Sequence, residues 1–198
     1  MALVTMPSSP AFTKSEWGIR RTVAISESPF TGATQVQKYD RAQWYATLTL
    51  PPMKREQAAE WQAFFMQCEG RANTFLLGDP DAKTVTGGAA PSSVSTSSAQ
   101  VQGAGSLNLT IGSGKKINKG SYLQIGTGSN AKLYMVVDDN TGNGNVSIQP
   151  PLKVSVASGT SVDITSPQGV FRMDSNDLTW SANELSIYGV TFSCSEAL

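Results

Sequence analysis

The chain has 198 residues, of which 15 are basic and 15 acidic, so its formal net charge is zero. This balance disfavours a nucleic-acid partner, which needs clustered lysine and arginine side chains. The sequence contains no histidine, which excludes Ser-His-Asp and Cys-His catalysis and HExxH zinc sites. We therefore expect no enzyme, no catalytic residue, no metal ligand and no cofactor. Low charge also weakens the repulsion between copies, so self-assembly is a hypothesis from the start.

The N-terminus has neither a basic start nor an apolar core, so we expect no secretory signal. No segment approaches the ~18 apolar residues of a membrane span. Cys68 and Cys194 form no CxxC motif, and we expect two free, buried thiols.

The first part of the chain predicts extended structure. Pro7 and Pro10 disfavour an early helix, and residues 1–16 are interpreted as an arm that becomes ordered only on assembly. Apolar alternation predicts a strand at residues 22–26, and Pro29 and Gly32 predict the turn that follows it.

The stretch from residue 43 to residue 70 carries the clearest patterns. Residues 43–50 (QWYATLTL) alternate as a strand does, and Pro51 and Pro52 end it. Residues 54–69 predict a helix whose apolar stripe includes Trp61, and Gly70 is a natural residue to follow its end.

The remaining chain predicts short strands. Residues 74–77 form one, and the small residues of 86–106 predict a flexible connector. Six short apolar runs with frequent turns follow up to residue 165, as in a small barrel or sandwich. Residues 169–173 and 185–194 predict the last two strands.

The fold class expected is mainly β. Residues 1–85 and 166–198 would form a β-sandwich-like domain that carries the helix, and residues 86–165 a small inserted β-barrel or sandwich domain. A serial two-domain chain is the alternative, but residues 166–198 alone give too few strands for a stable unit.

Three groups of polar residues merit a comparison of chemical and structural interpretations. The DDNTGNGN segment at residues 138–145 lacks EF-hand spacing, so a polar turn is favoured over a calcium loop. Asp79 with Asp81, and Asp174 with Asp177, are typical of turns rather than of paired catalytic acids. The IGSGKK segment at residues 111–116 lacks the spacing of a phosphate loop and predicts a hairpin.

Aromatic residues remain as candidates for binding. Trp44 and Trp61 suit the core, whereas Trp17, Tyr45 and Trp180 could lie on a sugar-binding face or a protein interface.

Taken together, these segments resemble the distal tail proteins of long-tailed (siphovirus-like) bacteriophages and related tail-like particles. The resemblance is densest in residues 28–80. It is carried by Trp17-Gly18-Ile19-Arg20, SPFTG (28–32) with Gln35, Trp44, LPPM (50–53), AAEWQAF (58–64), Gly70, TFLLGDP (74–80), Gly120, Tyr134, PPL (150–152), Phe171-Arg172 and Glu196-Ala197.

The resemblance implies a structural virion protein at the tail tip, synthesised in the host cytoplasm. Such proteins form a ring, usually a hexamer, that connects the tail tube protein to the hub or central fibre and serves as a platform for host-recognition parts. The family has no shared active site or cofactor. We list Trp17, Arg20, Phe30 and Tyr45 as candidate residues of the assembly interface. A carbohydrate-binding β-module of a tail or surface particle is the alternative function.

Overall fold

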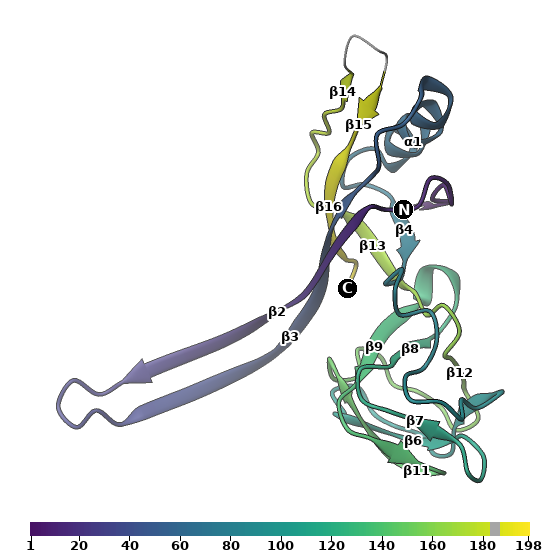
Figure 1. Ribbon diagram of the computed structural model, residues 1–198. Coiled ribbons are helices and arrows are strands. Elements are labelled where there is room, and N and C mark those ends of the chain that lie inside the picture. The colour runs from purple at the N-terminus through teal and green to yellow at the C-terminus, as the bar shows by residue number, and fades with distance from the viewer. Residues whose placement is uncertain (183–186) are drawn as a thin grey trace.

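The computed structural model describes residues 1–182 and 187–198, and of Asp40 the backbone alone. Its two main parts are a sheet of six described strands and a closed six-stranded barrel (Figure 1). The expected fold class, mainly β with a helix and a small barrel, is confirmed. Within the described residues, no helix is both long enough and apolar enough to cross a membrane.

The sheet takes its strands from both ends of the chain. The first two strands in its spatial order pair in parallel, and every other pair in the sheet is antiparallel. In spatial order it comprises β1 (Leu3–Val4), β4 (Thr74–Leu77), β13 (Gly169–Met173), β16 (Thr191–Glu196), β3 (Thr34–Thr49) and β2 (Lys14–Glu27).

The barrel lies between β4 and β13 in the sequence. Every strand pair in it is antiparallel, and its interior is a separate apolar cluster. Its order is β11 (Gly144–Gln149), β6 (Ser106–Thr110), β5 (Val94–Thr96), β12 (Ser161–Asp163), β8 (Tyr122–Ile125) and β9 (Lys132–Val136).

Smaller elements complete the fold. They are β7 (Lys116–Ile117) paired with β10 (Asn140–Thr141), β14 (Ser181–Ala182) paired with β15 (Tyr188–Gly189), and the 3-10 helix η1 (Gly128–Asn130).

Helix α1 (Arg55–Cys68) covers one face of the sheet, as its apolar stripe predicts. It agrees with the predicted helix to within one residue at each end. Glu69 and Gly70 both adopt a left-handed backbone, with φ of 49° and 62°. Gly70 suits this position because a Cβ there would lie 2.9 Å from Asn176.

Trp61 is the centre of the packing between helix and sheet. Its indole is 1% exposed and contacts the rings of Phe12, Phe64 and Phe192. The indole N–H donates to the carbonyl of Ser9 at 3.2 Å. The first residues of the chain are therefore part of the core that lies between α1 and the sheet.

This packing corrects the expectation of a free N-terminal arm. Val4 is buried, β1 pairs with β4, and Phe12 packs on Trp61. The physical reason is that apolar residues on either side of the two prolines find partners in their own chain: Val4 meets the sheet edge at β4, and Phe12 meets the aromatic cluster around Trp61. Residues 1–12 already have their partners within one copy.

Other expectations are also revised. The connector predicted at residues 86–106 is wrong in part, because Val94–Thr96 forms barrel strand β5 and Val94 is buried. Predicted strands 74–77 and 169–173 are confirmed. The strand predicted at 185–194 is interrupted: β15 and β16 occupy Tyr188–Gly189 and Thr191–Glu196, and residues 185–186 lie outside the described part. Cys68 and Cys194 are free and buried, as expected.

Candidate assembly surface

The β2–β3 hairpin extends far beyond the sheet to which it belongs (Figure 1). Lys14–Arg20 and Gln43–Thr49 lie within the sheet, whereas the outer halves pair only with each other. Every residue from Arg20 to Tyr39 except Ser28 is exposed. An isolated two-stranded hairpin is only marginally stable in water, so a projecting one is a candidate for burial against another chain.

One face of the outer hairpin is apolar at its middle. Ile25 lies opposite Val36, and Val23 lies opposite Lys38 on the same face. The side chains of Ile25 and Val36 are 69% and 60% exposed. The other face presents Ala24 and Ser26 on β2, and Gln35 and Gln37 on β3. The hairpin thus has one side suited to a partner and one suited to water.

The tip of the hairpin is a hydrogen-bonded turn. The Ser28 N–H donates to the Ala33 carbonyl, and the Gly32 N–H donates to the Ser28 carbonyl, each at 2.9 Å. Gly32 has φ of 67°, which glycine adopts without strain. Phe30 at this tip is 95% exposed. An ordered turn that presents a bare phenyl ring loses little entropy when it binds.

The four sequence-derived interface candidates do not lie together. Phe30 is at the tip, while Arg20 and Tyr45 meet near the root, where the guanidinium lies 5.5 Å from the ring centroid. Tyr45 lies over Gly18, its partner in the ladder. Trp17 is half-buried with its ring edge-on to Phe171. The structure therefore brings together Arg20 and Tyr45, and places Trp17 among the side chains that pack on the sheet core.

Sequence reasoning missed Val23, Ile25 and Val36 as surface residues. The strand predicted at 22–26 places Val23 and Ile25 on one face, but it does not reveal whether that face is covered. The length of β3, the second strand of the hairpin, was a signal in the sequence that the hairpin extends beyond the sheet. Residues 34–49 contain neither proline nor glycine, and 16 residues are far more than the five or six of an ordinary strand.

The root of the hairpin is braced by the barrel. Arg21 donates to the Gln149 side-chain oxygen at 2.9 Å. The Trp44 indole N–H donates to the Leu133 carbonyl at 3.0 Å, and its ring lies 5.7 Å from that of Tyr122. These contacts fix the direction in which the outer hairpin leaves the molecule.

A buried ion pair joins barrel and sheet beside this root. Lys153 is paired with Glu196, whose side chain is fully buried and also accepts the Trp44 backbone N–H at 3.2 Å. Burial lowers the pKa of Lys153, and the neighbouring Glu196 carboxylate opposes that shift. Burial also raises the pKa of Tyr134 to about 12, and its hydroxyl accepts the Lys153 backbone N–H. These groups are occupied in holding the two parts together.

The polar groups considered for chemistry are engaged within turns. Asn143 accepts the backbone N–H groups of Ile111 and Gly112, and Asp79 accepts that of Asp81. Ser175 accepts the Asp177 N–H. Among the described residues no cluster of three His, Cys, Asp or Glu side chains is placed to hold a metal ion.

Comparison with known proteins adds no assignment to this geometry. No protein-family model matches the chain, and a search of curated proteins finds no match either. Function is therefore inferred from the surface itself and from the resemblance of the sequence segments.

Proposed function

We propose that this chain is a structural virion protein that forms the distal ring of a phage-like tail, between the tail tube and the hub or central fibre. The observation that carries the proposal is the projecting β2–β3 hairpin with its exposed apolar residues. A surface of this kind is unfavourable on an isolated copy and is favourable when a neighbour covers it. The resemblance of residues 28–80 to distal tail proteins supports the same function.

A closed ring follows from contacts between unlike faces. When one copy offers a hairpin and the next offers a different surface, the contact is head-to-tail and a suitable rotation closes the circle. The open edges of β2 and of the outer part of β3 would be shielded in such an assembly, as exposed strand edges in proteins usually are. The braced root supplies a fixed direction for each contact.

The alternative function, binding of a carbohydrate, has less support. Sugar-binding surfaces rely on aromatic rings that are open to solvent. Residues 86–165 are all described, and their two aromatic side chains, Tyr122 and Tyr134, are buried. Trp180 is partly exposed and is the aromatic residue that a glycan screen should address.

The test is the mass of the purified protein in solution. Light scattering over a concentration series, with electron micrographs of the same fractions, should give a ring of about six 21.0 kDa copies. A protein that stays monomeric at every concentration, and that is not recruited by tail-tube protein, would overturn the proposal. Binding in a glycan screen by that monomer would then favour the carbohydrate-binding function.

A further inference from the structure

An open pocket with a volume of about 750 Å³ lies where the barrel meets the sheet. Its lining comes from β13 of the sheet, from barrel strand β9 and from the segment at residues 154–160 that precedes β12. Clefts between two packed parts of a chain are common ligand sites, and their usual volume is about 300–1,000 Å³. Position and size therefore make this pocket a candidate binding site.

The pocket is basic on one side. Lys132 and Arg172 line it, and none of the described lining residues is acidic. Within the described part of the chain, no carboxylate lies at ion-pair distance from either basic group. The buried Glu196, which precedes Ala197 of the lining, is already paired with Lys153. An anionic group in the pocket would therefore be attracted without competition from an internal acid.

Arg172 has hydrogen-bond donors that its own chain leaves unused. Its Nε is buried and has no acceptor among the described residues, and its Nη2 donates to the thioether sulfur of Met1 at 3.2 Å. A thioether is a weak acceptor, and Met1 is 89% exposed, so a stronger acceptor can replace it. A carboxylate can bind a guanidinium through two parallel hydrogen bonds, which would satisfy the donors that are now unused.

Apolar side chains form another part of the pocket wall. Ile125, Val156 and Val170 line it, and so does Val154, which is 55% exposed. Val170 lies two residues from Arg172 on the same side of β13, a separation of about 7 Å at 3.3 Å per strand residue. The pocket therefore suits a ligand that carries a carboxylate and an apolar group at about this separation.

The tip of the β2–β3 hairpin carries these two groups. Glu27 is the last residue of β2, and Phe30, which is 95% exposed, follows three residues later in the ordered turn. Three residues span at most about 10 Å, so the carboxylate and the ring can reach Arg172 and the wall at Val170 together. Glu27 is also the only acidic residue in the sequence from 20 to 39.

We propose that the hairpin tip of one copy inserts into this pocket of a second copy, with the Glu27 carboxylate on Arg172 and the Phe30 ring on the apolar wall. The inference rests on the proposed function, because it names the receiving surface of the same ring contact. Lys38 lies four residues from the start of β3, about 13 Å behind the tip. It therefore remains outside the pocket and away from the basic groups that line it.

The contact is made between copies, because the tip cannot reach the pocket of its own chain. The pocket shares Lys132 and Val154 with the cavity at the hairpin root, which is also lined by Ala42. From Ala42 the strand continues for eight residues to its start near the tip, a length of about 26 Å. Figure 1 shows that this outer part points away from both the barrel and the sheet.

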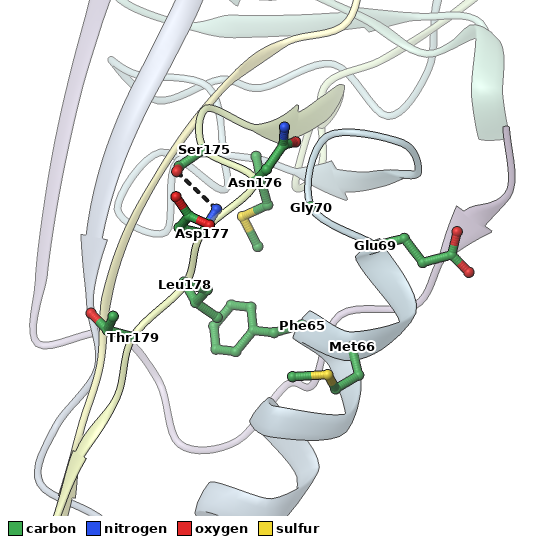
Figure 2. Close-up of a pocket in the computed structure, with 10 residues that line it drawn as sticks. Phe65, Met66, Glu69, Gly70, Ser175, Asn176, Asp177, Leu178 and Thr179 are labelled. Atoms are coloured by element: carbon green, nitrogen blue, oxygen red, sulfur yellow. Dashed lines mark hydrogen bonds between the residues drawn. The ribbon is translucent and has the colours of Figure 1, made fainter.

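Other cavities suit the tip less well. Figure 2 shows the pocket beside the C-terminal end of α1, whose described lining includes the acidic Glu69 and Asp177 and no basic residue. Glu27 would meet like charges there. The cavity at the hairpin root is smaller, about 520 Å³, and its Lys153 is already held in an ion pair. Charge complementarity therefore favours the pocket that contains Arg172.

Mixing of two variants tests the docking. Phe30→Ser removes the ring at the tip and leaves the pocket intact, whereas Arg172→Met removes the guanidinium and leaves the tip intact. Each variant alone should need more than about tenfold higher concentration than the native chain to assemble. An equal mixture should form dimers of twice 21.0 kDa and nothing larger, since one intact tip meets one intact pocket. Val101→Ser and Arg55→Met, changes at exposed positions elsewhere, should assemble normally.

The same ion pair is tested from its exposed side, where the fold is not at risk. Glu27→Gln should raise the concentration needed for assembly by about tenfold or more. Glu60→Gln, the same change at an exposed position on α1, should leave it unchanged. This comparison decides the outcome if a denaturant titration shows that Arg172→Met destabilises the half-buried site.

A disulfide provides a second readout that detects a weak contact. Mixed Phe30→Cys and Val154→Cys proteins, treated with a mild oxidant, should give a mixed dimer identified by mass spectrometry. Phe30→Cys with Val101→Cys should not, and the native cysteines are buried.

The failure of the docking and the failure of the ring are distinguishable. If the native chain assembles while Glu27→Gln assembles equally well, or if no disulfide joins positions 30 and 154, the docking is overturned and the ring remains. If the native chain stays monomeric but the mixed disulfide forms, the docking is supported without the ring. If neither assembly nor the disulfide is observed, both proposals are overturned.

Discussion

The two halves of the β2–β3 hairpin are built from the same strands but have different surroundings. In the inner half Trp44, Ala46 and Leu48 are buried under α1 and the barrel. In the outer half Ile25 and Val36 occupy equivalent alternating positions and are exposed. Alternation thus fixes which side chains share a face, whereas the cover over that face decides whether they stabilise the monomer or remain free for a partner.

Trp61→Ala should show the largest loss of stability, because it removes the side chain at the centre of the core between α1 and the sheet, to which the inner half of the hairpin belongs. We expect the free energy of unfolding to fall by about 3–5 kcal/mol, as for other large aromatic truncations. The indole also loses its hydrogen bond to Ser9. A denaturant titration measures the change, with Phe30→Ala as the matched aromatic truncation in the uncovered half. Phe30→Ala should change stability by less than about 0.5 kcal/mol, and equal losses would remove the contrast between the halves.

Lys153→Met should have the next largest effect, because it leaves the Glu196 carboxylate buried without its cation. We expect a loss of about 3 kcal/mol, at the low end for a broken buried pair since Lys153 is partly accessible. The double variant Lys153→Met/Glu196→Gln buries no charge and should be more stable than Lys153→Met alone. A double-mutant cycle in denaturant checks this, and additive losses would show that the pair does not connect barrel and sheet energetically.

Gly18→Ala, near the boundary between the inner and outer halves of the hairpin, should lower stability by a smaller amount. A Cβ at Gly18 would lie 2.4 Å from the Tyr45 ring, so the ring must swing away and leave Arg20. Because Tyr45 is a surface side chain that can move, we expect a loss of about 1 kcal/mol. The same change in a Tyr45→Ala background should cost less, and thermal unfolding of the four proteins measures the difference. If Gly18→Ala lowers stability as much in the Tyr45→Ala background, the strain does not come from the Tyr45 ring.

Sequence patterns predicted those elements that carry their own local signals. Helix α1 carries its own stripe and stop signal, and residues 74–77 and 169–173 have clear boundaries. The length of the hairpin was not predicted, because strand pairing depends on a partner strand rather than on local preference. Phe30, Arg20 and Tyr45 were named as interface candidates, and all three are exposed. The exposure of Met66, which is 62%, was not predicted, because a methionine on a helix has the same pattern whether it packs in a core or lies open to solvent.

Shortening the hairpin should have the smallest effect on stability and is the sharpest test of the comparison. Replacement of residues 24–37 by Asn-Gly keeps the Val23–Lys38 pair and closes it with a favourable two-residue turn. Since the removed residues form strand pairs only with one another, the free energy of unfolding should change by less than about 0.5 kcal/mol, measured by denaturant titration. The shortened protein should nevertheless fail to assemble in light scattering. A loss above about 2 kcal/mol would mean that the outer hairpin supports the monomer, and normal assembly would mean that the ring contact lies elsewhere. Intact stability without assembly would assign the exposed apolar residues to a second chain, because nothing else in the molecule would depend on them.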